Sequence, residues 1–194
     1  DNRLKEELSS SEKNIAENLM IVDVLRNDIS RVSKKGSVEV TELAKIKSYK
    51  NVHHLVSTIK GSLSEKLDAI DLLFATLPGG SITGAPKIRA MEIISELEKN
   101  RRGVYCGAIG FISFSKDSDF NIPIRTLTIA DDTISINCGG GIVSDSNAES
   151  EYQESIDKIE NILRENRKKI IKQSSNVNQK WLHISTVNLE EIKK

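Results

Sequence analysis

The sequence predicts an α+β fold, in which helices and antiparallel strands are mixed along the chain. Two observations favour this class. In some segments apolar residues recur at helical spacing, whereas others are rich in β-branched residues and are joined by short polar turns, as the strands of hairpins are. The elements do not alternate strictly between strand and helix, so a doubly wound parallel sheet is not expected.

The first half of the chain predicts both kinds of element. A helix is expected over residues 11–22, where apolar side chains repeat every three or four positions and Ser10 or Ser11 can cap the first turn. The other elements expected in this half are strands over residues 37–40 and 54–59, and helices over residues 67–77 and 86–97, the last beginning at Pro86.

The second half predicts strands followed by one long helix. Strands are expected over residues 104–114, 122–129 and 133–137, the first two joined by a polar turn. A capping box from Ser146 to Glu149 is expected to open a helix that ends near Arg164. Beyond it the sequence becomes rich in Lys, Asn and Ser, so we expect one domain over residues 1–165 and a tail or linker over 166–194.

The composition excludes some classes of function. Lys plus Arg and Asp plus Glu both number 28, and this balance argues against a general nucleic-acid binder. No apolar run reaches the roughly 18–20 residues of a membrane span, and the charged first residues do not resemble a signal peptide. Cys106 and Cys138 lack metal-ligand spacing, so reduced thiols in a cytoplasmic protein are expected. Because residue 1 is not Met, we expect a piece of a longer protein.

Carboxylates on two predicted helices are candidates for a metal site. Glu151, Glu154 and Lys158 share one face of the last helix, and Glu17 lies on the first. A solvated face with an ordinary Glu–Lys pair is the alternative. If the two helices converge, their carboxylates make an all-oxygen site, which suits Mg²⁺.

Two glycine-rich loops are candidates for anion binding. Residues 78–87 lead into a helix but lack the Gly-Lys-Ser/Thr ending of a nucleotide phosphate loop, so an NTPase is not expected. Exposed N–H groups near that helix start favour an anion such as a carboxylate. Gly139, Gly140 and Gly141 let a backbone approach a ligand closely. A plain turn and a β-bulge are the respective alternatives.

Single polar residues in predicted strands complete the candidates. Arg125 lies in the apolar strand expected over residues 122–129, where a substrate carboxylate would suit its guanidinium; an edge-strand Arg in solvent is the alternative. His53 and His54 begin another strand, so one of them should point inward and be buried.

Several of these segments together resemble the chorismate-binding enzymes, a family that includes component I of anthranilate synthase and of aminodeoxychorismate synthase. The resemblance runs from about Ser11 to Arg164. The segments that carry it are residues 78–92, 105–111, 124–127, 139–146 and 151–158. Within the family, the motif Gly-Gly-Ser-Ile-Thr-Gly-Ala-Pro-Lys most resembles that of aminodeoxychorismate synthases.

The resemblance implies a fold and an activity. The fold is two packed, mostly antiparallel β-sheets with flanking helices, of which this chain is only the C-terminal portion. The activity is the Mg²⁺-dependent amination of chorismate to 4-amino-4-deoxychorismate for folate synthesis, with ammonia from a glutamine amidotransferase subunit. Component I of anthranilate synthase, in tryptophan synthesis, is one alternative, and a non-catalytic binding or scaffold fragment is another.

The resemblance also implies roles for individual residues. Glu17 and Glu154 resemble direct Mg²⁺ ligands, and Glu151 a ligand that acts through water. His54 and Ser81 correspond to polar residues that flank the substrate ring. The residues implied to hold the enolpyruvyl carboxylate of chorismate are Tyr105, Arg125, Gly139, Gly140, Gly141 and Lys158.

The sequence departs from the family pattern in two places. The Pro-Ile-Lys-Gly-Thr motif, whose lysine is the nucleophile in aminodeoxychorismate synthases, is absent and is expected upstream of Asp1. Without it the chain alone is expected to catalyse nothing. Asn14 stands where the family usually has an acid, which lowers the negative charge near the expected metal.

Overall fold

The computed structural model describes residues 2–49, 52–130, 133–144, 146–160 and 182–185. The chain divides into two compact units. Unit 1 comprises Asp1–Ile93 and Phe111–Asp119, and unit 2 comprises Ile94–Gly110 and Phe120–Lys194. Each unit is described by itself.

A long helix organises unit 1. The predicted helix over 11–22 is confirmed as the first part of α2, Glu12–Ser30, and a short helix that the sequence did not predict, α1, Asn2–Ser10, precedes it. Ser11 is the N-cap, and its side chain accepts the backbone N–H of Asn14. Two residues on α2 are buried, Val22 and Asp28, so the helix packs along a narrow stripe.

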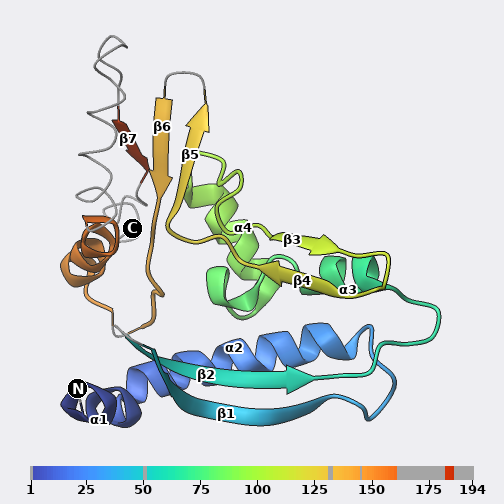
Figure 1. Cartoon of the computed structure of the whole chain (residues 1–194). Helices are drawn as coiled ribbons and strands as arrows, with labels where there is room; N and C mark the ends of the chain where they lie inside the picture. The colour runs from blue at the N-terminus through green and yellow to red at the C-terminus, as the bar shows by residue number, and fades with distance from the viewer. Residues whose placement is uncertain (1, 50–51, 131–132, 145, 161–181, 186–194) are drawn as a thin grey trace. The chain divides into compact units, whose positions relative to one another are not determined.

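An antiparallel hairpin lies beside α2 (Figure 1). Its strands are β1, Glu39–Ser48, and β2, His53–Lys60, so the strand predicted over 37–40 was much too short. The register shifts between Glu42 and Lys45, where Ala44 has a left-handed φ of 47° and donates its N–H to Ser57 Oγ. That bulge interrupts the alternation that would have revealed the rest of the strand.

Two further helices match the predictions closely: α3, Ala69–Thr76, and α4, Lys87–Leu97. The short 3₁₀ helix η1, Gly80–Ile82, lies in the glycine-rich loop between them and was not predicted. Asp68 caps α3 by accepting the N–H groups of Ile70 and Asp71, and the Asp71 carboxylate accepts the N–H of Asp68 in return.

The segment predicted as one strand over 104–114 is divided. Residues 103–106 form a turn, in which Cys106 has a left-handed φ of 64°. Only β3, Ile109–Ile112, is extended, and it pairs with β4, Ser118–Asn121, where a polar turn was expected. The apolar residues on both sides of Gly107 predicted one strand, but the chain turns before this glycine and becomes extended only at Ile109.

The core of unit 2 lies between a three-stranded sheet and a helix. The strands are β5, Thr126–Ala130, β6, Thr133–Asn137, and β7, Leu182–Ser185; β5 runs antiparallel to β6 and β7 parallel to it. Ile136 and Cys138 pack with Ile159 of the helix over residues 148–160, and all three are buried. β7 falls in the predicted tail, whose other residues lie outside the described ones, so the division at residue 165 stays a prediction.

The last helix begins differently from the prediction. Asn147 Oδ1 accepts the N–H of Ser150, so Asn147 is the residue that caps the helix. Ser146 instead uses its hydroxyl on Val143 N–H and on the Glu151 carboxylate. The predicted helix end near Arg164 lies outside the described residues. No helix in the described part of the chain has both the length and the apolar character needed to cross a membrane.

Candidate functional site

The glycine loop after β6 lies against the hydroxyl of Tyr105. A Cβ atom added to Gly139 would be 3.1 Å from Tyr105 Oη, which is closer than ordinary van der Waals contact. Tyr105 comes from the turn after α4, and Gly139 follows Cys138 in the core of unit 2. Glycine at this position therefore lets the phenol hydroxyl approach the backbone.

The next glycine of the loop faces the charged side chains of the last helix. A Cβ added to Gly140 would lie 3.1 Å from Glu151 Oε2 and 3.8 Å from Lys158 Nζ. The Lys158 ammonium donates to the Gly139 carbonyl at 3.3 Å and forms an ion pair with Glu154 at 2.6 Å. Six of the predicted site residues are thus gathered at one place in unit 2: Tyr105, Gly139, Gly140, Glu151, Glu154 and Lys158.

The two carboxylates of this helix have different surroundings. Glu151 is only 4% exposed, and its Oε1 accepts a hydrogen bond from Ser146 Oγ at 2.6 Å. The Glu154 side chain is 51% exposed. The i,i+4 pair of Glu154 and Lys158 is present, but the alternative of a solvated face fits only Glu154, because the Lys158 side chain is 24% exposed. It does not fit Glu151, since burial of an acid requires polar partners.

Burial also governs the ionisation of the groups behind the loop. It raises the pKa of Tyr105 above the ordinary value of 10.0, and the neighbouring Cys106 raises it further. It likewise raises the pKa of the Cys106 and Cys138 thiols above 9.0. Both cysteines are free and buried, as predicted. Near neutral pH, Tyr105 is therefore a neutral O–H that can donate to an anion.

Arg125 does not lie inside a strand, contrary to the prediction. β5 begins at Thr126, and Arg125 is exposed in a bend with a left-handed φ of 50°. Pro123, two residues earlier, has no N–H for a strand ladder, which helps to explain why the pairing starts late. A left-handed φ is uncommon for a side chain of this size, and such strained residues are concentrated at functional sites.

In unit 1, α2 supports the predicted site residues of other elements. Glu17 lies on α2 and is half-buried, and Asn14 lies one turn before it. The adjacent Asn18 donates to the Leu55 carbonyl at 3.3 Å and accepts from Ser57 Oγ at 2.5 Å. These bonds fix β2, which carries His54, against the helix that carries Glu17.

Neither histidine of β2 is buried, so the prediction that one would be is wrong. His53 is half-buried and its Nδ1 lies 2.8 Å from Ser48 Oγ. His54 is exposed and its ring meets the edge of Tyr49, with centroids 5.6 Å apart. Ser57 of the same strand bonds to Asn18 of α2, and alternation along a strand places His54, three positions earlier, on the opposite face.

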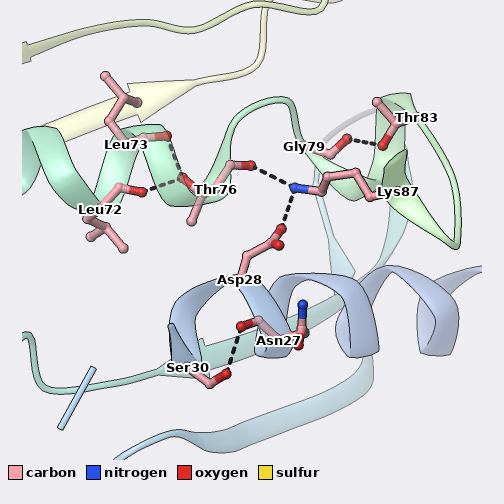
Figure 2. Close-up of polar contacts among 9 residues, drawn as sticks. All are labelled: Asn27, Asp28, Ser30, Leu72, Leu73, Thr76, Gly79, Thr83 and Lys87. Atoms are coloured by element: carbon pink, nitrogen blue, oxygen red, sulfur yellow. Dashed lines mark hydrogen bonds and ion pairs between the residues drawn. The ribbon is translucent and has the colours of Figure 1, made fainter. Parts of the chain in front are cut away.

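The loop that carries Ser81 is held on α2 at two points. Gly80 is buried, and a Cβ there would come within 2.8 Å of Val24 Cγ1. At the other end of the loop, the Lys87 ammonium pairs with the Asp28 carboxylate at 2.5 Å and donates to the Thr76 carbonyl at 3.4 Å (Figure 2). Ser81 itself, in η1, is exposed.

The ion pair of Asp28 and Lys87 is a feature that the sequence did not reveal. The two side chains are 4% and 16% exposed, although they are 59 positions apart in the chain. Asp28 is followed on α2 only by Ile29 and Ser30, so it lies in the last turn of the helix. An acid in the buried stripe of a helix was the signal available, but its partner could be found only in three dimensions.

The three predicted metal ligands are divided between the units. Glu17 belongs to unit 1, and Glu151 and Glu154 belong to unit 2. Among the described residues, no group of three or more His, Cys, Asp or Glu side chains is placed to hold a metal ion. The metal assignment therefore stays a prediction.

All of the candidate site residues lie in the part of the chain that matches one protein family. The model of the family of chorismate binding enzymes covers residues 1–164. The chain belongs to this family. It is 55% identical over 165 residues to aminodeoxychorismate synthase component 1 of Escherichia coli, covering 85% of this chain and 36% of that protein.

Other members of the family are also similar to this chain over most of its length. Anthranilate synthase component 1 of Aquifex aeolicus is 49% identical over 164 residues, which are 84% of this chain and 33% of that protein. The crystal structure of anthranilate synthase component I from Streptococcus pneumoniae matches 81% of this chain and 36% of its own, with 46% identity and a TM-score of 0.71. The predicted family and the α+β fold are confirmed. The chain spans about a third of the length of these relatives.

Proposed function

We propose that the protein containing this chain is component I of an aminodeoxychorismate synthase, which aminates chorismate to 4-amino-4-deoxychorismate for folate synthesis. The observation that carries the proposal is the cluster of Tyr105, Gly139, Gly140, Glu151 and Lys158 in unit 2. The 55% identity to the Escherichia coli enzyme of that name favours this member of the family over the others.

The cluster has the chemistry of a carboxylate site. Tyr105 offers a neutral hydroxyl donor, Lys158 an ammonium, and the loop a backbone without side chains to obstruct a ligand. We infer that Tyr105, Lys158 and the backbone of Gly139, Gly140 and Gly141 hold the enolpyruvyl carboxylate. Arg125, which is exposed, would complete this set as a bidentate partner.

The donor set fits a magnesium ion. Glu17 and Glu154 would be direct ligands and Glu151 would act through water, and hard oxygen donors of this kind are those that Mg²⁺ prefers. The burial of Glu151 beside the loop agrees with this assignment, because a buried carboxylate needs nearby positive charge. When bound, the ion would orient the ring carboxylate and balance its charge. Because Asn14 stands where the family usually has an acid, the surroundings of the ion would carry one negative charge fewer.

The remaining groups are assigned from the resemblance. His54 and Ser81, both exposed, would flank the substrate ring. The nucleophilic lysine would come from a segment outside this chain, and ammonia from a glutamine amidotransferase subunit. Residues 1–165 would form the C-terminal half of the catalytic domain and 166–194 a separate tail. The two buried thiols agree with a cytoplasmic location.

Component I of anthranilate synthase is the second candidate. It is favoured by the 49% identity to the Aquifex aeolicus protein and by the likeness to the Streptococcus pneumoniae structure. A fragment that binds but does not catalyse is the third candidate, because Asn14 stands where the family usually has an acid, which would weaken metal binding.

The test is the product formed from chorismate. The longest natural protein that contains this chain would be supplied with chorismate, Mg²⁺ and ammonium, and the products would be separated and identified. We expect 4-amino-4-deoxychorismate, and anthranilate would instead establish the second candidate.

A chimera tests the third candidate. Residues 1–164 of this chain would replace the matching third of the Escherichia coli enzyme. Activity in the chimera would mean that the site residues of this chain support catalysis when the rest of the enzyme is supplied. An inactive chimera that folds and still binds chorismate would favour the fragment without catalysis.

A further inference from the structure

An ion pair at the end of α4 adjoins the turn that carries Tyr105. Arg102 Nε donates to Glu98 Oε2 at 2.8 Å, and Nη2 donates to Oε1 at 2.6 Å, so the contact is bidentate. The side chains are 25% and 17% exposed. A paired fork of this kind fixes the orientation of both groups more firmly than a single exposed contact does.

The backbone connects this pair directly to Tyr105. The Arg102 carbonyl accepts the N–H of Tyr105 at 3.1 Å, which closes the turn. On the other side of Tyr105, Cys106 donates its N–H to the Pro123 carbonyl at 2.8 Å. Cys106 adopts its left-handed φ of 64° there, and the neighbouring turn bonds hold it in that conformation. Tyr105 is thus anchored through both of its neighbours.

The side chains of the same residues lie close to one another. The Arg102 guanidinium lowers the pKa values of Tyr105 and Cys106 against the larger effect of burial, so its charge reaches both groups. The Tyr105 hydroxyl lies against the backbone of Gly139. A continuous set of contacts therefore runs from α4, through Arg102 and Tyr105, to the glycine loop.

We propose that Glu98 and Arg102 are positioning residues, which hold the Tyr105 hydroxyl against the glycine loop so that it can donate to a carboxylate of the substrate. The inference rests on the proposed function for the identity of that carboxylate. Arg102 is not expected to touch the substrate, because Glu98 occupies two of its donors. An ion pair that only stabilised the end of α4 would have no reason to affect binding at Tyr105.

The first test is kinetic and uses the whole protein. Arg102→Met and the milder Glu98→Gln are each expected to raise the KM for chorismate about tenfold, the effect of one hydrogen bond to a charged group, with kcat within about twofold. Exposed Arg101 supplies the matched control, and Arg101→Met should leave both constants unchanged. In a Tyr105→Phe background the effect of Arg102→Met should shrink to less than about twofold, because coupled residues are not additive.

The second test needs no substrate. With ¹³C-labelled tyrosine, NMR would follow the ionisation of Tyr105, assigned by its loss in Tyr105→Phe. Because the charge of Arg102 itself lowers the pKa of Tyr105, the variant used is Arg102→Lys, which keeps the charge but loses the planar fork. If Arg102 positions the ring, Arg102→Lys should release it towards water and lower its pKa towards the ordinary value of about 10.

The outcomes separate this inference from the proposed function. An unchanged or raised pKa of Tyr105 in Arg102→Lys, or an equal effect of Arg102→Met on KM with and without the Tyr105 hydroxyl, would overturn the positioning role. Failure of the unaltered protein to aminate chorismate would overturn the proposed function, and the NMR titration would still decide whether Arg102 positions Tyr105.

Discussion

The two units support their predicted site residues in different ways. In unit 2 the site residues themselves are in contact: Tyr105 meets Gly139, and Gly140 faces Glu151 and Lys158. In unit 1 the supporting contacts belong to other residues. Asn18 and Ser57 join the elements of Glu17 and His54, and an ion pair holds the loop of Ser81.

This difference separates residues that are important for activity from residues that are important for stability. In unit 1 the buried polar groups are scaffold, so their loss should lower the free energy of unfolding. In unit 2 the polar groups of the loop and helix are available to a ligand, so their loss should lower activity with little effect on unfolding.

The largest expected effect is on stability, in unit 1. Asp28→Asn leaves the Lys87 ammonium in a nearly buried position without its counter-charge, which should cost about 3–5 kcal/mol of unfolding free energy. The matched control is Asp23→Asn, which breaks an exposed pair with Arg26 on the same helix and should cost less than about 1 kcal/mol. Urea denaturation followed by circular dichroism measures both.

A double variant tests the cause of that loss. Asp28→Leu combined with Lys87→Met removes both charges, so it should cost much less than Asp28→Asn alone. If Asp28→Asn costs no more than Asp23→Asn, the ion pair is not part of the scaffold of unit 1.

The next largest effect is on activity, in unit 2. Glu154→Ala in the whole protein should lower Mg²⁺-dependent turnover by about 100-fold or more, because a direct ligand of the metal would be lost. The Glu154 side chain is 51% exposed, so its ion pair with Lys158 contributes little to folding, and the unfolding free energy should change by less than about 1 kcal/mol. Exposed Glu160, on the same helix, is the control. Near-normal turnover in Glu154→Ala would remove the metal-ligand assignment.

A smaller effect is expected at Arg125. Arg125→Lys keeps the charge but loses the planar fork, so the KM for chorismate should rise about tenfold while kcat stays within about twofold. Steady-state kinetics of the whole protein measure this, with Arg101→Lys as the exposed control. An unchanged KM would mean that the exposed Arg125 has no part in binding.

The smallest effect concerns the thiols behind the loop. Because burial raises the pKa of Cys106 and Cys138, their thiolate fraction at pH 8 is low, and alkylation located by mass spectrometry should be about tenfold slower than for free cysteine. A raised pKa in the folded state contributes stability that is present below the unfolded value, near 9, and is lost as the pH rises through the folded one. Unfolding should therefore become easier above about pH 9. Rapid alkylation at pH 8 would show that Cys106 and Cys138 are accessible to solvent, contrary to their burial in the structure.

The sequence by itself determined the local elements and the family. Helical spacing gave α2, α3 and α4, and alternation with turn residues gave β2 and β6, because these signals depend on neighbours only a few positions apart. It also identified the glycines and acids that the site uses. Where an irregular backbone intervened, as at Ala44, Cys106 and Arg125, the strand limits were wrong, since left-handed residues leave no mark on a hydrophobic pattern.

Only the tertiary structure decided how each polar residue is used. Glu151 and Glu154 are equivalent in a helical pattern, yet one is buried beside Gly140 and the other is exposed, because a glycine loop from elsewhere in the chain covers only the first. The same holds for Asp28, whose partner Lys87 is 59 residues away. Burial and pairing depend on such distant contacts, which local periodicity does not encode.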